Sequence, residues 1–220
     1  MRFHIITLFP DMCRSYANES ILKRAQEKKI VSFQYYDPKD FTNRKFDRVD
    51  NRPYGGGPGM VLEAIPVVRA GEKALAVAKK KKGKIATFFF SPSGKQFDAK
   101  MARMLAKTYT DIILISGRYE GIDARAKKIL KAKELSIGPY VLTGGELPAM
   151  VVADSVSRQI KGVLGTFASV EEERTASADV YTRPEKFMHK GKIYRVPKVL
   201  LTGDHKKIEE WKRKNKRQKS

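Results

Sequence analysis

The chain has 220 residues, of which 41% are hydrophobic, so it can bury a core without disulfides or metal ions. Lys and Arg number 45 against 24 Asp and Glu, and the formal net charge is +21. An excess of this size favours a polyanionic partner such as nucleic acid, the alternative being a surface that serves solubility alone. Cys13 is the single cysteine, which excludes an internal disulfide, and no Cys/His spacing indicates zinc.

The N-terminal segment Phe3–Phe9 is β-branched and aromatic, and Pro10 ends it. It predicts an opening strand, because its apolar run is too short for a signal peptide. No other stretch approaches the length of a membrane span. We therefore expect a soluble, cytoplasmic protein without a membrane partner.

Apolar strands alternate with helical patterns along the chain as far as Ile160. Further strands are expected at Val31–Asp37, Ile85–Phe90 and Ile112–Ile115. Helices are expected from Asp11 to about Lys29 and at Ile65–Lys80, Phe97–Lys107, Ala124–Leu130 and Leu147–Ile160. Continuous apolar strands between helices are typical of a parallel sheet covered on both faces, so the sequence predicts an α/β fold.

The last part of the chain differs from the rest in composition. Residues 163–180 are mostly polar and small without an apolar period, which predicts a flexible linker between a first domain, 1–162, and a second, 181–220. From Arg183 onward there are 14 Lys and Arg against 4 Asp and Glu. We expect a small, mostly helical, basic C-terminal domain that binds RNA phosphates.

The first of three glycine-rich segments is Asp50–Met60, DNRPYGGGPGM. Its glycines and prolines exclude a helix or a central strand and predict a loop whose backbone can approach a flat ligand closely. It lacks the GK[ST] ending of a nucleoside-triphosphate loop. A tight surface connection is the alternative.

The second segment, Ser116–Asp123, directly follows the strand Ile112–Ile115. Ligands bind α/β sheets at the carboxyl ends of parallel strands, so this loop is a candidate binding element. We expect Asp123 to cap the next helix, which leaves Glu120 as the better functional candidate.

The third segment, Ser136–Pro148, combines a short apolar stretch with glycines and enters a helix. Its backbone groups can hydrogen-bond a purine edge, and Tyr140 and Leu142 can enclose the ring. It is not the GxGxxG fingerprint, so a bound nucleoside would need another geometry. A fourth, smaller loop is expected at Phe90–Gly94.

Asp154 and Arg158 lie on one face of the predicted helix that follows, four residues apart. The spacing favours an ordinary surface ion pair, worth about 0.3–0.5 kcal/mol. The alternative is that Asp154 orients the Arg158 guanidinium into a site.

The chain closely resembles the bacterial tRNA (guanine-37-N1)-methyltransferases of the SPOUT class in four blocks: DNRPYGGGPGM, SGRYEGIDAR, SIGPYVLTGGELPAM and DSVSRQIKGVLG. The resemblance extends over almost the whole chain and implies a parallel-sheet domain with a deep trefoil knot. It implies S-adenosylmethionine as methyl donor and N1 of guanosine 37, beside the anticodon of tRNA, as acceptor. It also implies a homodimer with each site at the subunit interface.

The resemblance assigns binding roles to two sets of residues. Asp50, Pro58 and Gly59 match the loop that binds the bases at and beside the target. The predicted cofactor pocket consists of Phe90, Ser91, Pro92, Gly117, Tyr119, Glu120, Ile137, Gly138, Tyr140, Val141, Leu142, Gly144, Gly145 and Pro148.

The chemistry requires a base and a cation. Guanine N1 is protonated at neutral pH, so the enzyme must remove that proton and stabilise the charge that moves onto O6. Arg158 matches the family's catalytic arginine. The family's catalytic aspartate lies in the linker, where this chain has glutamates instead, so Glu173 is the candidate base, followed by Glu172 and then Asp179.

Two alternative functions remain, and the requirement for a metal ion is open. The chain can be another SPOUT RNA methyltransferase that acts on a ribose 2′-hydroxyl, or a non-catalytic tRNA-binding homologue with a decayed site. A magnesium requirement is known in the family, but the sequence shows no dedicated metal ligands beyond Glu120 and the linker carboxylates.

Overall fold

The structure is a computed structural model that describes residues 1–164 and 179–215. The chain divides into two compact units, Met1–Gly165 and Thr166–Ser220. This division falls within the predicted linker 163–180, most of which lies outside the described residues.

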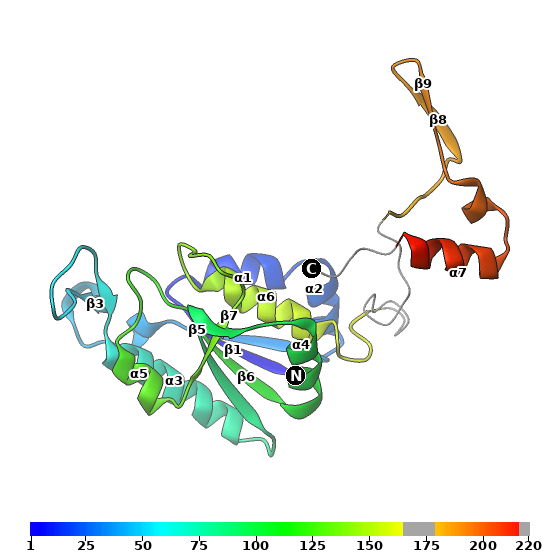
Figure 1. Cartoon of the computed structure of the whole chain (residues 1–220). Coiled ribbons are helices and arrows are strands. Elements are labelled where there is room, and N and C mark those ends of the chain that lie inside the picture. Colours follow the sequence, from blue (N-terminus) through cyan, green and yellow to red (C-terminus); the bar gives the residue numbers. More distant parts are fainter. Residues whose placement is uncertain (165–178, 216–220) are drawn as a thin grey trace. The chain divides into compact units, whose positions relative to one another are not determined.

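Unit 1 is built on a five-stranded parallel sheet with the order β2-β1-β6-β5-β7 (Figure 1). The strands are β1 (Arg2–Ile6), β2 (Ser32–Tyr36), β5 (Ile85–Gln96), β6 (Asp111–Ile115) and β7 (Lys133–Ser136). Every residue of the central strand β6 is buried, as expected for a parallel sheet covered on both faces. The α/β prediction is therefore confirmed.

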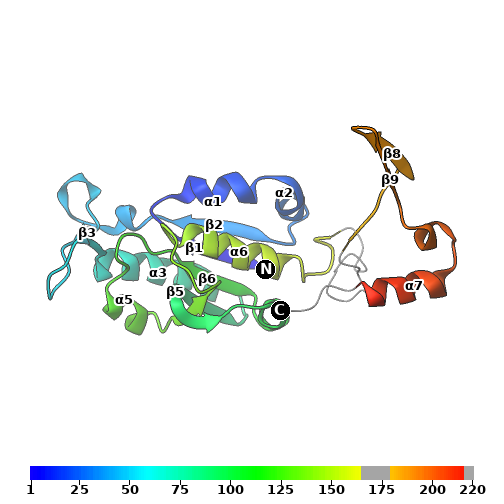
Figure 2. The same cartoon turned by 45° about the horizontal axis from the view of Figure 1, so that its top comes forward.

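Helices cover both faces of this sheet (Figure 2). One face packs against α1 (Pro10–Ala17), α2 (Ser20–Glu27), α4 (Ala99–Thr108) and α6 (Glu146–Ser157). The other packs against α3 (Ala64–Lys79) and α5 (Ala124–Ile129). Successive side chains of a strand alternate between faces, so Phe3 and Ile5 contact the first layer and Ile6 the second.

The structure differs from the sequence prediction in two elements of unit 1. The helix predicted from Asp11 to about Lys29 is two helices, because the backbone is extended at Glu19 and has a positive φ of 48° at Ser20; the Gln26 side chain donates to the Ala17 carbonyl at the end of α1. Strand β7 was not predicted, since it is a four-residue edge strand with two charged residues.

Short elements complete the connection between β2 and α3. These are the 3-10 turns η1 (Pro38–Phe41) and η2 (Lys45–Asp47) and the antiparallel pair β3 (Asp50–Asn51) and β4 (Val61–Leu62). The first glycine-rich segment is the loop that joins β3 to β4.

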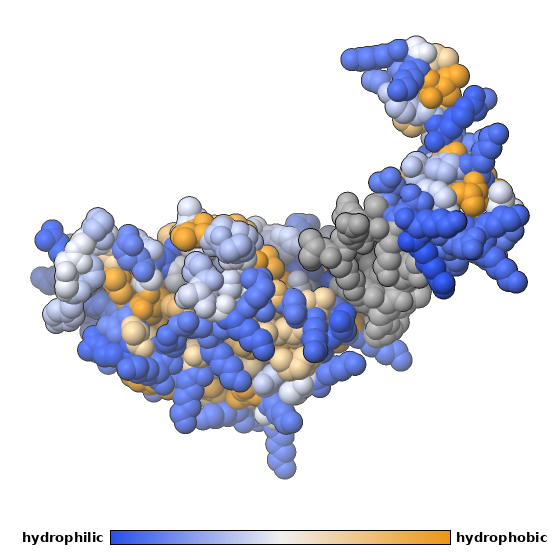
Figure 3. Space-filling view, in the orientation of Figure 1, coloured by the Kyte–Doolittle hydropathy of each residue, from blue (hydrophilic) through white to orange (hydrophobic). Residues whose placement is uncertain are grey.

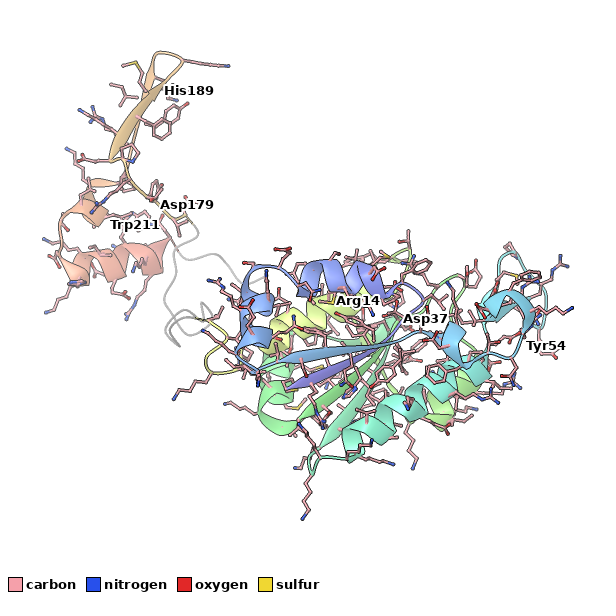
Figure 4. The ribbon with its side chains drawn as sticks, turned by 180° about the vertical axis from the view of Figure 1, so that it is seen from behind. Arg14, Asp37, Tyr54, Asp179, His189 and Trp211 are labelled. Atoms are coloured by element: carbon pink, nitrogen blue, oxygen red, sulfur yellow. The ribbon has the colours of Figure 1, made fainter. Side chains whose placement is uncertain are left out.

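The described part of unit 2 contains a hairpin of β8 (Lys186–His189) and β9 (Lys192–Arg195), the 3-10 turn η5 (Lys198–Leu201) and α7 (His205–Lys214) (Figure 4). The hairpin was not predicted; its two-residue turn, Lys190-Gly191, has positive φ at both residues. No described residue of unit 2 is fully buried. Its basic side chains are therefore open to a partner.

A network of polar side chains is buried on the face of the sheet that α3 covers. The His4 ring lies 2.9 Å from an Asp111 carboxylate oxygen and 3.0 Å from the Tyr36 hydroxyl, and Arg2 pairs with Asp111 at 2.8 Å. Burial lowers the pKa of His4, although the hydrogen bond to Asp111 opposes this shift. Burial alone would raise the pKa of Asp111, but hydrogen bonds from His4, Arg2 and Thr110 together lower it.

We expect the protein to lose stability as pH falls below about 6.5, because the unfolded chain then protonates His4 while the folded chain does not. One such group changes the free energy of unfolding by up to about 1.4 kcal/mol per pH unit. Urea unfolding between about pH 7.5 and about pH 5.5 measures this slope. His4→Gln should flatten it, whereas His189→Gln, which removes an exposed histidine, should not; equal slopes in all three proteins would contradict the prediction.

Candidate active site

A cavity of about 380 Å³ opens beside β5 and β7 and the loop that follows β6. Its walls come mainly from Phe89–Pro92 of β5, the loop 117–122 and the segment 134–148, and Ala124 and Lys127 of α5 complete them. All fourteen residues of the predicted cofactor pocket line it. The second and third glycine-rich segments therefore share one cavity, while the binding role of each residue stays a prediction.

Gly145 shows why the third segment needs glycine where it meets the second. The Gly145 amide donates to the Gly117 carbonyl at 2.9 Å. A Cβ on Gly145 would lie 2.6 Å from the Ser116 Cα and 2.8 Å from the Gly117 amide nitrogen, and backbone atoms cannot rotate away. This close approach forms one side of the cavity.

A buried ion pair joins these two segments to the start of the chain. The Arg118 Nε lies 3.0 Å from the Glu146 Oε2, without the alignment of a hydrogen bond, and Glu146 is 2% exposed. The other Glu146 oxygen accepts from the Thr7 hydroxyl at 2.7 Å, and the Arg118 guanidinium lies over the Phe9 ring at 4.4 Å. These interactions fix both walls of the cavity to the end of β1.

Glu146→Ala is expected to lower the free energy of unfolding by about 2–4 kcal/mol, because it removes the partner of the largely buried Arg118, which is 16% exposed, and the acceptor of the buried Thr7 hydroxyl. Glu134→Ala is the matched control: Glu134 lines the same cavity and pairs with Lys127, but both side chains are about a third exposed. The decrease for this control should stay below about 1 kcal/mol. Denaturation with urea measures both, and equal decreases would contradict the role of the buried pair.

Sequence reasoning predicted Glu120 but missed the other three charged residues of the cavity. Arg118, Lys127 and Glu134 line it beside the predicted residues. Arg118 lies within the second glycine-rich segment, so this motif could have indicated Arg118 as a site residue. Glu134 precedes the third segment on an unpredicted strand, and nothing in its local sequence marks it.

The first glycine-rich segment contacts the second. The Glu120 amide donates to the Met60 carbonyl at 3.0 Å, and the Leu62 amide donates to the Gly121 carbonyl at 3.0 Å. A Cβ on Gly59, whose φ is +82°, would lie 2.7 Å from the Glu120 Oε1. The loop therefore packs directly against the rim of the cavity.

The three residues predicted to bind the target base lie in the first glycine-rich segment, Asp50 in β3 and the other two on the loop, and do not line the cavity. Asp50 is opposite Leu62 in the pairing of β3 with β4, while Pro58 and Gly59 are exposed. Tyr54 on the same loop is fully exposed (Figure 4). An exposed loop at the rim of a cavity is a suitable position for binding a large substrate.

Arg158 does not line the cavity either. It follows α6, and Pro148 in the first turn of that helix lines the cavity; the ten residues from Pro148 to Arg158 span about 15 Å. The predicted ion pair with Asp154 does not form, because the Tyr16 hydroxyl of α1 donates to the Asp154 carboxylate instead. The Arg158 Nε is buried without a hydrogen-bond partner among the described residues.

Only one of the three candidate bases lies among the described residues. Glu172 and Glu173 lie outside the described residues, and Asp179 is exposed at the start of the described part of unit 2. Within residues 1–164 and 179–215, no group of three or more His, Cys, Asp or Glu could hold a metal ion. Over the same residues, no helix is long and apolar enough to cross a membrane.

Comparison with known proteins gives one consistent family. A profile of the family described as "tRNA (Guanine-1)-methyltransferase TrmD" matches residues 1–220. The tRNA (guanine-N(1)-)-methyltransferase of Clostridioides difficile is 44% identical, covering 97% of this chain and 91% of the relative, and that of Thermomicrobium roseum is 45% identical, covering 97% and 78%. The crystal structure of a tRNA (m1G37) methyltransferase from Aquifex aeolicus matches with a TM-score of 0.78 at 37% identity, covering 96% of this chain and 87% of that one.

A profile match over the full length and relatives above 40% identity define the protein as a methyltransferase. The chain belongs to the tRNA (guanine-N1)-methyltransferase family. These comparisons confirm the family resemblance of the four sequence blocks.

Proposed function

We propose that this enzyme transfers a methyl group from S-adenosylmethionine to N1 of guanosine 37 in tRNA. The observation that carries the proposal is that the predicted cofactor residues, far apart in sequence, line one cavity whose rim is the predicted base-binding loop. Family membership supports the activity, and the net charge of +21 suits an RNA substrate.

The cavity fits the proposed cofactor in size and chemistry. Its volume of about 380 Å³ is within the range of small-molecule sites, and glycines leave its backbone groups accessible to a purine. Glu134 is paired with Lys127 and Arg118 with Glu146, which leaves Glu120 as the carboxylate in the lining that suits a ligand with a positive charge. When bound, S-adenosylmethionine supplies an activated methyl group, so the protein needs no nucleophile of its own.

The residues of the chain then have to activate the guanine. A linker carboxylate, with Glu173 the first candidate, removes the N1 proton, and the Arg158 guanidinium stabilises the negative charge on O6. Asp50, Pro58 and Gly59 hold the target base and its neighbours. If a magnesium ion takes part, Glu120 and the linker carboxylates are the residues that would hold it.

A homodimer is part of the proposal, because Arg158 is far from the cavity of its own chain. A second copy of the chain can bring its Arg158 to this cavity. The supporting observation is an exposed apolar face shared by α1 and α6, formed by Met12, Tyr16, Leu147 and Val151. Hydrophobic patches of unit 1 are visible along its upper side in Figure 3.

The trefoil knot and a tRNA-binding C-terminal domain complete the proposal. The return of residues 137–145 from β7 to the Gly117 loop supports a chain path that threads between elements. The open basic side chains of unit 2 support binding of RNA phosphates.

Methyl transfer to a guanosine-37 tRNA tests the proposal, with the product nucleoside identified by mass spectrometry. N1-methylguanosine is the expected product, and a tRNA with another base at position 37 is the control. A ribose-methylated nucleoside would instead establish the 2′-hydroxyl activity. Calorimetry with S-adenosylmethionine alone tests the decayed-site alternative, which predicts no binding.

A further inference from the structure

A second cavity, of about 420 Å³, lies at the amino ends of the strands of unit 1. Thr110 lines this cavity just before β6, and Gly117 lines the candidate active site just after it. At about 3.3 Å per residue, the strand separates the two cavities by about 23 Å. No step of the proposed methyl transfer uses this amino-end cavity.

The amino-end cavity is strongly cationic. The Met1 ammonium group, Lys29, Lys81 and Lys82 line it, and its nine lining residues, all within the described chain, include no carboxylate. Arg2 also lines it, but its charge is neutralised by the buried Asp111. The three lysines make no ion pair with any described residue, so their charges remain available to an anion.

Backbone hydrogen bonds hold the chain segments that carry these cations at the amino ends of the strands. The Met1 ammonium donates to the Ile30 carbonyl at 2.9 Å, and the Ser32 amide donates to the Met1 carbonyl at 3.1 Å. On the other side, the Thr110 amide donates to the Lys84 carbonyl at 3.0 Å, which fixes the end of the lysine run 79–84. Lys81 and Lys82 therefore lie in a turn whose end is held by a backbone hydrogen bond.

The turn between α3 and β5 projects at the lower end of unit 1 in Figure 1, and long hydrophilic side chains extend from it in Figure 3. Besides its cations, the cavity offers the Ser32 hydroxyl, whereas the Thr110 hydroxyl donates to the Asp111 carboxylate, and the cavity contains no aromatic side chain on which a base could stack. Ammonium and hydroxyl donors without a stacking platform bind phosphate groups rather than bases.

We infer that the amino-end cavity is a second RNA-binding site, which holds backbone phosphates of the substrate tRNA at a distance from the target base. The inference rests on the proposed function for the identity of the RNA. A site of this kind contributes to affinity and not to sequence choice, because phosphates carry no sequence information.

The test is the variant Lys29→Gln/Lys81→Gln/Lys82→Gln in the full chain, with tRNA affinity measured by filter binding. At about 0.1 M salt, removal of the cations that bind even one phosphate should weaken binding about tenfold. The slope of log K against log salt should become shallower by about one unit for each phosphate that the variant no longer neutralises. The kcat at saturating tRNA and the affinity for S-adenosylmethionine should not change.

The matched control is Lys128→Gln/Lys131→Gln/Lys133→Gln, which removes the same charge from exposed positions at the opposite edge of the sheet. If both variants bind tRNA alike, the inference is overturned. If tripolyphosphate binds the wild-type protein but not the first variant, while tRNA affinity is unchanged, the site takes free phosphates and the RNA assignment is also overturned. Binding is measured without catalysis, so failure of the proposed function would appear separately, as absence of methyl transfer by the wild-type enzyme.

Discussion

Replacing Arg158 with alanine is expected to lower kcat by about 10²–10³-fold while the affinity for S-adenosylmethionine stays unchanged. The physical reason is that charge develops on O6 only as the N1 proton leaves, so a guanidinium directed at O6 stabilises the transition state more than the bound substrate. The cofactor cavity should be unaffected, because Arg158 is not among its lining residues. Single-turnover methyl transfer measures the first effect and calorimetry the second.

Lys161→Ala is the control for Arg158→Ala, because it removes an exposed cation three residues further along the chain and should keep normal activity. Mixed dimers test whether the site is shared. An Arg158→Ala chain has an intact cavity. A Glu120→Ala chain has an intact Arg158 but lacks a predicted cofactor-binding carboxylate, so it should be inactive by itself. Combining the two inactive chains should restore part of the activity if Arg158 acts in the cavity of a second copy; no recovery would contradict the shared site.

The parts of the fold that could be predicted are those whose signal is local. The apolar run of β6 and the glycine-rich segments 116–123 and 136–148 are continuous in sequence, and their chemistry indicates a buried strand and close backbone approaches. That they line one cavity follows from the parallel sheet, which brings the carboxyl ends of its strands to one edge.

The parts that could not be predicted depend on interactions between distant residues. The spacing of Asp154 and Arg158 predicted a pair, but α1 packs beside α6 and Tyr16 takes the Asp154 carboxylate. Likewise, Arg118 and Glu146 are 28 positions apart, and only the return of the chain to the Gly117 loop brings them together. Local spacing fixes which pairs are possible, and tertiary packing selects among them.

Glu173→Gln is expected to lower kcat by at least about 100-fold, because the neutral amide cannot accept the N1 proton of guanine. A glutamate can replace the family's aspartate chemically, since both carboxylates have similar ordinary pKa values and differ by one methylene group. Glu173→Asp should therefore retain much of the activity. The pH profile of methyl transfer gives an independent measurement, because the acidic limb of the profile reports protonation of the base.

Glu172→Gln is the closest control, since it removes the same charge from the adjacent residue, and Asp179→Asn removes the remaining candidate carboxylate. If Glu173 is the base, both variants keep the acidic limb and most of kcat. If kcat falls in Glu172→Gln or Asp179→Asn instead, the base is that residue, and the assignment from position in the linker is wrong. Three fully active variants would mean that none of the three candidate carboxylates removes the proton, and Glu120 at the cavity would become a carboxylate to test next, because it is exposed at the rim where the base-binding loop packs.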